Sequence, residues 1–305
     1  MQTREEMIKR LTQADTPSIR LFVLTRLEGL PPDHPQVVQE QAHVAAQEPV
    51  LSILQEQYIE GYWIWDRRYY SPKYKSTHWS MQLLTELGLS GDHPAMQKGA
   101  LYMNQRLQKN LHEQIEHEES GLACFWGNFL RYQLHCLPVE NTIIQDTISL
   151  LVREIECDSV CKWNYELPCA WGVIRALWGL AAIPTEKRTS AVQHAIQHGL
   201  EFVLKRYSLV DADYPYKEKI HKRWFSLNFP LFYNVDILFT LGVLKELDAL
   251  DHPSARKALD WLESKQMKNG KWHGSSPFRG RTWAFTAGND TADTWATLHA
   301  LTVLQ

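Results

Sequence analysis

The sequence lacks the features that mark several common classes of protein. No stretch stays free of charged residues long enough to cross a bilayer, so a transmembrane segment is not expected. The first eleven residues include Arg4, Glu6, Lys9 and Arg10, a charge pattern that excludes the apolar core of a signal peptide. The net charge is only −3, which gives no electrostatic reason to expect a nucleic-acid partner.

Cysteine is also scarce. The five cysteines are an odd number and include no Cys-x-x-Cys pair of the kind that binds zinc. Neither a disulfide framework nor a metal is therefore expected, and no cofactor is predicted. This cysteine usage indicates a reducing cytoplasm.

Hydrophobic residues are plentiful, at 44% of the 305 positions, and aromatic residues make up 11%. The length allows either one large domain or two of average size. An Asp-His-Pro triplet recurs after Leu-rich segments, at 33–35, 92–94 and 251–253, and such a triplet favours the start of a helix. Because internal repetition indicates one repeated unit, we expect a single domain over residues 1–305.

Two kinds of helix alternate along the chain. The segments after the triplets are amphipathic, with apolar residues three and four positions apart, whereas others are apolar almost all round. Amphipathic helices are predicted near 3–13, 35–56, 94–108, 141–156, 188–206 and 253–267, and apolar helices near 17–28, 76–88, 122–135, 168–182, 229–248 and 290–304. This alternation predicts an all-α fold, an (α/α)6 toroid of about six helical hairpins in two concentric rings, with an open solenoid as the alternative.

The segment 257–272 carries a longer motif. Its basic, small, aromatic and aliphatic residues, followed by Gln266, Gly270 and Trp272, match every specified position of the QW motif of squalene and oxidosqualene cyclases. Partial copies lie at 98–103 and at Gln57, Gly61 and Trp63. The chain therefore resembles the terpenoid cyclase and protein prenyltransferase superfamily, which implies the toroid and gives the Gln and Trp a structural role.

The chain departs from the catalytic patterns of this superfamily. Triterpene-type cyclases carry an Asp-x-Asp-Asp-Thr-Ala string whose central Asp donates a proton, and here Asn289 stands at that position. Ala296 replaces the zinc-binding His of the prenyltransferases, so zinc is not expected. The resemblance thus implies a single-domain member without an intact acid motif.

Three carboxylates are candidates for a catalytic acid. Asp236 lies in the most apolar stretch of the sequence, where burial should raise its pKa as a general acid requires. The alternative is a carboxylate bonded to a helix N-terminus or to an arginine. Asp290 and Asp293 are the other candidates, with helix capping as the alternative for Asp290.

An aromatic residue opens the apolar helices at one recurring place, at Trp79, Trp126, Trp171, Tyr233 and Trp295. These rings form a collar around a substrate if they face inward, or spacers between the rings of helices if they do not. The long loops 61–76, 208–228 and 269–288 precede these helices, so we expect the site at that rim. There, Arg223 and Arg281 are predicted to bind an anionic head group.

Three functions are consistent with these features. The first is a terpenoid-cyclase-like protein that binds, and cyclises or isomerises, an isoprenoid or similar apolar ligand by carboxylate acid catalysis. The second is a carbohydrate-active enzyme of the α/α-barrel type, which also combines an aromatic cleft with carboxylates. The third is a non-catalytic toroid that binds an apolar ligand. The QW match favours the first and third, and Asn289 favours the third over a standard cyclase.

Overall fold

The computed structural model describes residues 3–117, 121–207, 209, 210, 221 and 223–305. Within these residues the structure is helical, with isolated β-bridges and no strand, which confirms the predicted all-α class. The α-helices are α1 (Arg4–Leu11), α2 (Pro17–Phe22), α3 (Pro35–Ala46), α4 (Val50–Gln55), α5 (Thr77–Glu86), α6 (Pro94–Glu116), α7 (Ala123–Cys136), α8 (Thr142–Glu156), α9 (Ala170–Ala181), α10 (Ser190–Glu201), α11 (Ile237–Glu246), α12 (Pro253–Glu263) and α13 (Ala292–Val303). Two π-helical segments, η1 (Val23–Leu27) and η4 (Phe202–Tyr207), extend α2 and α10.

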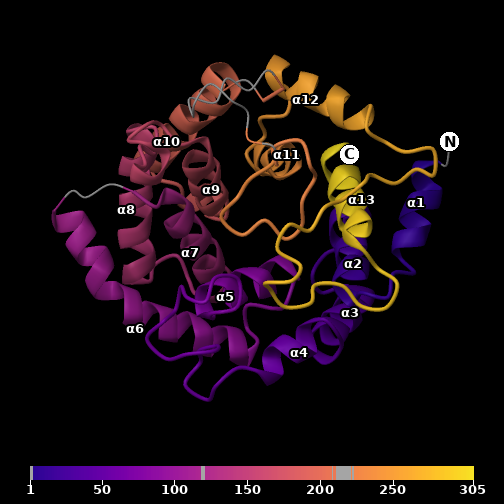
Figure 1. Ribbon diagram of the computed structural model, residues 1–305, viewed down its shortest axis with the longest axis horizontal. Helices are drawn as coiled ribbons and strands as arrows, with labels where there is room; N and C mark the ends of the chain where they lie inside the picture. The colour runs from indigo at the N-terminus through magenta and orange to yellow at the C-terminus, as the bar shows by residue number, and fades with distance from the viewer. Residues whose placement is uncertain (1–2, 118–120, 208, 211–220, 222) are drawn as a thin grey trace.

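The helices lie in an inner and an outer layer (Figure 1). Around the outside run α1, α3, α4, α6, α8, α10 and α12, while α2, α5, α7, α9, α11 and α13 lie nearer the centre. Successive inner helices pack against one another, from α5 through α7, α9 and α11 to α13, and α13 also contacts α1 and α2. The first and last helices, α1 and α13, therefore lie side by side (Figure 1).

Burial differs between the layers as the sequence pattern predicts. In α5 every residue from Thr77 to Leu84 is buried, and in α9 every residue from Gly172 to Leu180 is buried. The outer helix α12 instead buries one stripe, formed by Ala255, Ala258, Leu259 and Leu262. This stripe has the spacing of three and four residues that one apolar helix face requires.

The QW motif joins an outer helix to an inner one. The indole Nε1 of Trp272 donates to the carbonyl oxygen of Leu262 at the end of α12, at 2.7 Å. The backbone N–H of Trp272 donates to Thr297 Oγ1 in α13, at 3.1 Å. Since the Trp272 ring is also buried, one residue fixes the distance between α12 and α13.

The partial copy of the motif makes the same contacts. Trp63 donates through Nε1 to the carbonyl of Ile53 in α4, at 2.8 Å, and through its backbone N–H to Thr77 Oγ1 in α5, at 3.1 Å. The motif glutamines donate to a glycine carbonyl four residues later, at 3.2 Å in the first copy and 2.9 Å in the second. Those glycines, Gly61 and Gly270, have φ of 100° and 80°, which favours glycine. The repeat is thus structural as well as sequential.

The Asp-His-Pro triplets begin α3, α6 and α12, as predicted, but the histidine is the capping residue. In each triplet the histidine Nδ1 accepts a hydrogen bond from the backbone N–H two residues later, at 3.4, 3.2 and 3.2 Å for His34, His93 and His252. The proline follows at the first helical position, where its missing N–H costs nothing. The three histidines are therefore the N-caps of α3, α6 and α12.

Three predicted helix boundaries were wrong. The helix expected over 94–108 continues to Glu116 as α6. The apolar helix expected from residue 229 begins at Ile237, where the Asp236 side chain caps it by accepting a hydrogen bond from the backbone N–H of Phe239. The segment predicted as one helix over 35–56 is divided into α3 and α4 before Val50. Pro49 precedes the second helix, and an X-Pro step disfavours helical backbone at the residue before it.

Candidate functional site

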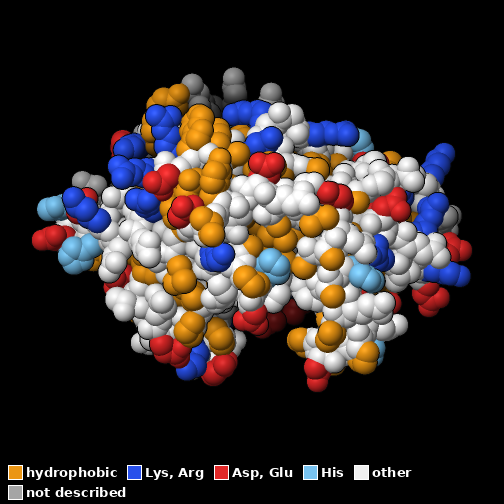
Figure 2. Space-filling model, turned by 90° about the horizontal axis from the view of Figure 1, so that it is seen from below, with side chains coloured by type: hydrophobic (Ala, Val, Ile, Leu, Met, Phe, Trp, Pro, Cys, Tyr) orange, Lys and Arg blue, Asp and Glu red, His pale blue; other side chains and the backbone are white. Residues whose placement is uncertain are grey.

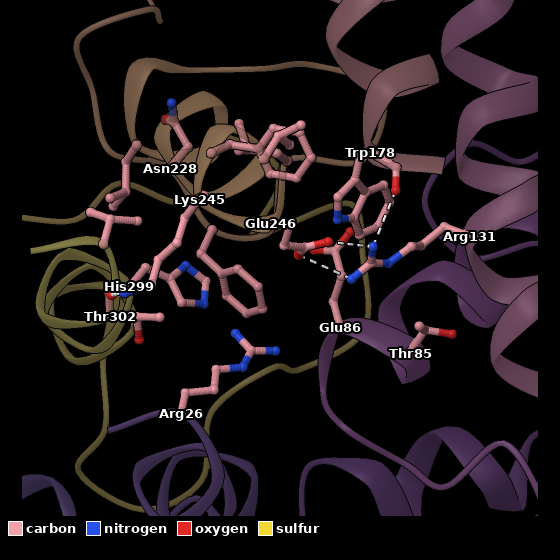
Figure 3. Close-up of a pocket in the computed structure, with 17 residues that line it drawn as sticks. Arg26, Thr85, Glu86, Arg131, Trp178, Asn228, Lys245, Glu246, His299 and Thr302 are labelled. Atoms are coloured by element: carbon pink, nitrogen blue, oxygen red, sulfur yellow. Dashed lines mark hydrogen bonds and ion pairs between the residues drawn. The ribbon is translucent and has the colours of Figure 1, made fainter. Parts of the chain in front are cut away.

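The described part of the chain forms a cavity of about 430 Å³ among the inner helices. Its wall consists of the C-terminal ends of α5 and α13, most of α11, three residues of the irregular segment before α11, and single residues of η1, α7 and α9 (Figure 3). A side view of the molecule shows a notch at its lower edge with acidic side chains deep inside (Figure 2). The lining residues are Arg26, Thr85, Glu86, Arg131, Trp178, Asn228, Phe229, Leu231, Leu238, Phe239, Gly242, Val243, Lys245, Glu246, His299, Thr302 and Val303.

One side of this lining is apolar, and it includes open space beside Gly242, which has no side chain. The apolar residues are Trp178, Phe229, Leu231, Leu238, Phe239, Val243 and Val303. A Cβ atom added to Gly242 would meet no heavy atom within 4 Å. Helix α11 therefore leaves open space where most helices carry a side chain, and this space belongs to the cavity.

A bidentate ion pair lies on the charged side of the cavity. Arg131 of α7 donates through Nη1 and Nη2 to the two carboxylate oxygens of Glu246 in α11, at 2.6 and 3.1 Å (Figure 3). Arg131 Nη1 also donates to the carbonyl of Trp178, at 3.1 Å, and its guanidinium lies 4.9 Å from the centre of the Trp178 ring. Because parallel N–H···O bonds of this kind are strong and directional, the pair has a fixed orientation.

A second carboxylate, Glu86 at the end of α5, lies beside a buried arginine. Its Oε1 accepts a hydrogen bond from Gln82 at 2.7 Å and lies 3.9 Å from Nη1 of Arg175, which is completely buried in α9. Burial raises the pKa of Glu86, and Arg175 opposes that shift. Arg175 itself donates to the carbonyl of Asn234 at 3.2 and 2.6 Å, and burial lowers its pKa to about 10. It remains cationic at neutral pH.

Arg26 enters the cavity from η1 without a partner. Its guanidinium lies 3.7 Å from the centre of the Phe22 ring. Among the described residues, none accepts a hydrogen bond from this guanidinium or forms an ion pair with it. The side chain is exposed to solvent, and desolvation by the nearby protein together with the positive charge of Arg131 lowers its pKa to about 10, against the attraction of Glu246 and Glu86. Arg26 is therefore a cation whose donors are available to a ligand.

His299 and Lys245 complete the polar lining. Burial, together with the positive charge of Arg26, lowers the pKa of His299 to about 3, so the imidazole is neutral at physiological pH. Figure 3 shows Arg26, His299 and Glu246 directed toward the same central space. Lys245 Nζ donates to the carbonyl of Thr302 in α13 at 2.6 Å.

The predicted acid Asp236 is buried but does not line this cavity. It is the N-cap of α11, where Oδ1 accepts a hydrogen bond from the backbone N–H of Phe239 at 2.8 Å. Its Oδ2 accepts from the backbone and the side chain of Asn228. Burial raises the pKa of Asp236 to about 6, as its apolar neighbours predicted, while these hydrogen bonds lower it. Both oxygens are occupied by structural contacts.

The other predicted carboxylates also hold loops in place and do not line the cavity. Asp290 Oδ2 accepts a hydrogen bond from the backbone N–H of Thr16 at 2.7 Å, which ties the approach to α13 to the start of α2. Asp293 Oδ1 accepts from the backbone N–H of Gly274 at 2.8 Å. The N-cap of α13 is Thr291, so Asp290 is not the capping residue.

The predicted aromatic collar is divided between three environments, and none of its five rings lines the cavity. Tyr233 lies between Trp79 and Trp171, with ring centres 6.0 and 6.3 Å away. Trp126 instead faces the outer layer, because its Nε1 donates to Gln114 of α6 at 2.8 Å. Trp295 stacks on Phe229, with centroids 4.1 Å apart, and through that ring it supports the cavity wall.

The two predicted head-group arginines lie in the long loops, away from the cavity lining. Arg223 donates to Asn234 Oδ1 at 2.9 Å, and Arg281 lies 4.8 Å from the centre of the Tyr74 ring. The described parts of these loops pack into one another; for example, Thr282 donates to the carbonyl of Tyr74 at 2.8 Å. Part of the predicted rim loop 208–228 lies outside the described residues, including Tyr214, Tyr216, Lys217, Lys219 and Lys222.

Two further properties of the described residues bear on function. No group of three or more His, Cys, Asp or Glu side chains in this part of the chain is arranged to hold a metal ion. None of its helices combines the length and apolarity needed to cross a membrane.

Comparison of the chain with protein-family models, curated proteins and solved structures found no match.

Proposed function

We propose that the two layers of helices form a closed α/α toroid of the terpenoid cyclase and prenyltransferase kind. The sequential packing of the inner helices and the contact of α13 with α1 and α2 support closure. The matching contacts of Trp63 and Trp272 support the QW repeat on which the resemblance rests. In this proposal the cavity among the inner helices is the centre of the toroid.

The function that this geometry supports best is the binding of a small, largely apolar, isoprenoid-like molecule in the cavity. The observation that carries the proposal is the cavity itself, with its volume of about 430 Å³ and its aromatic and aliphatic wall. Ligand sites in proteins have volumes of about 300 to 1,000 Å³ and are mostly apolar with a few polar groups. The space beside Gly242 extends the apolar part.

The resemblance also implies acid-catalysed cyclisation or isomerisation, but the charges around the cavity favour binding. Arg26, Arg131, Lys245 and the adjacent Arg175 outnumber the carboxylates Glu86 and Glu246. An excess of positive charge in a partly desolvated site opposes the formation of a carbocation. The carboxylates that the sequence nominated are committed to loop and helix contacts. We therefore propose a binding protein and not a cyclase.

The proposal can be tested by filling the cavity. Gly242→Leu places a side chain in the open space of α11 without removing any lining group, so it should leave the fold intact and abolish binding of farnesol. Gly280→Ala, at a loop glycine whose Cβ would also meet open space, is the matched control and should bind as the unmodified protein does. Binding is measured by calorimetry and by native mass spectrometry.

Three results of this experiment would contradict the proposal. One is equal binding of farnesol by the Gly242→Leu variant and the control. Another is the absence of farnesol binding together with retention of a sugar by the purified protein, which would favour the carbohydrate-active alternative. The third is conversion of farnesol or farnesyl diphosphate to a cyclic product, detected by gas chromatography, which would restore the cyclase.

A further inference from the structure

The unpaired guanidinium in the cavity carries an inference about the ligand, and this inference rests on the proposed function. The other cations at the cavity each have a described partner: Arg131 binds Glu246, Lys245 binds the carbonyl of Thr302, and Arg175 binds the carbonyl of Asn234. The guanidinium of Arg26 lies 3.7 Å from the centre of the Phe22 ring and is attracted by the charges of Glu246 and Glu86, but it has no hydrogen-bond acceptor among the described residues. Arg26 is exposed to solvent, so its unbonded N–H groups are open to an anion that arrives with the ligand.

The surrounding charges limit how negative that anion can be. Glu246 is held by Arg131 through both oxygens, and Glu86 lies on the same wall beside Arg175, so these two pairs are close to neutral. Lys245 adds a further positive charge to the lining, but its Nζ lies at the C-terminal carbonyls of α13, which carry partial negative charge. One added negative charge would then balance Arg26. A diphosphate, with several negative charges, would also meet the two carboxylates in a site where charges are poorly screened. The lining therefore matches a single negative charge.

The neutral histidine supports the same conclusion. His299 lies on α13 beside Arg26, and its nitrogens have no hydrogen-bond partner among the described residues. A neutral imidazole offers one N–H donor and one acceptor. It can donate to one carboxylate oxygen while the Arg26 fork binds the group in a bidentate manner. Both side chains point into the central space (Figure 3).

We propose that the cavity selects an apolar molecule that carries one carboxylate, with Arg26 binding the carboxylate and the wall around Gly242 holding the apolar body. The apolar residues Leu238, Phe239 and Val243 lie on the same helix as Gly242, so one side of α11 faces the body of the ligand. The ligand class is thus an isoprenoid acid or a similar amphipathic monocarboxylate.

The experiment compares one apolar body with different head groups. Farnesoic acid, farnesol and farnesyl diphosphate share their chain, and acetate provides the head group alone. Calorimetry at pH 7.5 should show farnesoic acid binding at least about tenfold more tightly than farnesol, because the carboxylate forms charge-assisted hydrogen bonds. Farnesyl diphosphate should bind more weakly than farnesoic acid, and acetate should not bind measurably.

Variants identify the group responsible. Arg26→Met keeps the side-chain length and removes the charge, so it should reduce the preference for farnesoic acid over farnesol to less than about threefold. Arg26→Lys keeps the charge without the fork and should give an intermediate preference. Arg67→Met, at an arginine whose side chain is 83% exposed and outside the cavity lining, is the control and should change nothing.

The possible results separate this inference from the proposed function. If farnesol and farnesoic acid bind the unmodified protein equally, or if farnesyl diphosphate binds most tightly, the inference is wrong while the cavity still binds apolar ligands. If none of the three farnesyl compounds binds, the proposed function fails as well. If Arg26→Met still prefers farnesoic acid over farnesol, another residue binds the carboxylate and the role proposed for Arg26 is wrong. This conclusion holds even if the variant is less stable than the unmodified protein.

Discussion

Replacing Trp272 by alanine tests whether the QW motif holds the two layers together. Trp272 is only 2% exposed, and the substitution removes its ring and the hydrogen bond from Nε1 to Leu262. Removing a buried tryptophan side chain costs about 3 to 5 kcal/mol of unfolding free energy, because transfer and cavity terms add. We expect a loss in that range. Ligand contacts should be unaffected, since Trp272 does not line the cavity.

The contribution of the indole N–H can be separated from that of the ring. Trp272→Phe keeps an aromatic ring and removes the donor, while the carbonyl of Leu262 retains the backbone N–H of Lys265 as a partner at 3.0 Å. The expected loss is therefore smaller, about 1 kcal/mol. Circular dichroism at 222 nm during urea unfolding measures both variants.

A matched control gives the result that would refute this reasoning. Trp163 is 76% exposed, so Trp163→Ala should change the unfolding free energy by less than about 0.5 kcal/mol. Trp63→Ala, in the other copy of the motif, should resemble Trp272→Ala because its ring is buried and its contacts are the same. If Trp272→Ala and Trp163→Ala lose equally little stability, the motif does not tie the layers together.

Three further predictions concern titration, a helix cap and metal content. Burial lowers the pKa of His78 to about 3, so below pH 6.5 the unfolded chain takes up a proton that the folded chain does not. The unmodified protein should therefore lose stability as the pH falls from 7 to 5, by up to about 1.4 kcal/mol per pH unit. In urea unfolding, His78→Gln should lose less stability than the unmodified protein over the same pH range. Asp236→Asn should cost about 1 to 3 kcal/mol in the same assay at pH 7, since one acceptor oxygen is replaced by a donor among three N–H groups; no loss would mean that the cap is dispensable. Protein purified without added metal should contain far less than one equivalent of zinc by mass spectrometry of the elements, and a full equivalent would contradict the inference from Ala296.

The helices could be predicted from the sequence because the buried face of a helix repeats apolar residues with the helical period. A helix with one solvent-exposed face, such as α12, places its apolar residues three and four positions apart. An inner helix such as α9 has no solvent-exposed face, so its sequence is apolar almost throughout. The boundary at Ile237 could not be found in this way. Residues 229–236 are as apolar as the helix that follows them, but they form an irregular segment that packs against the other long loops.

The cavity residues escaped prediction because single charges at helix ends resemble solvent-exposed residues. Glu86 and Glu246 each end a helix, and Arg26 follows the short helix α2, so no spacing connects them. One feature of the sequence could have indicated the cavity: Arg131 and Arg175 are charged residues within otherwise apolar helices. Buried arginines require partners. Asp236 is likewise a charged residue in an apolar segment, and burial raises its pKa as its neighbours predict. Its partners are the backbone N–H groups of Asn228 and Phe239 and the side-chain amide of Asn228.

The position of the cavity follows from what occupies each end of the inner helices. At their N-terminal ends the long loops insert aromatic rings, and Tyr74, Phe232 and Phe278 pack together with centroids 4.4 to 5.6 Å apart. The C-terminal ends are joined to the outer helices by short turns, which leave the centre uncovered. Helix C-termini carry partial negative charge and attract cations, as Lys245 shows at the carbonyl of Thr302. Arg26 is the cation at this end that has no hydrogen-bond acceptor among the described residues, and the proposed carboxylate site rests on it.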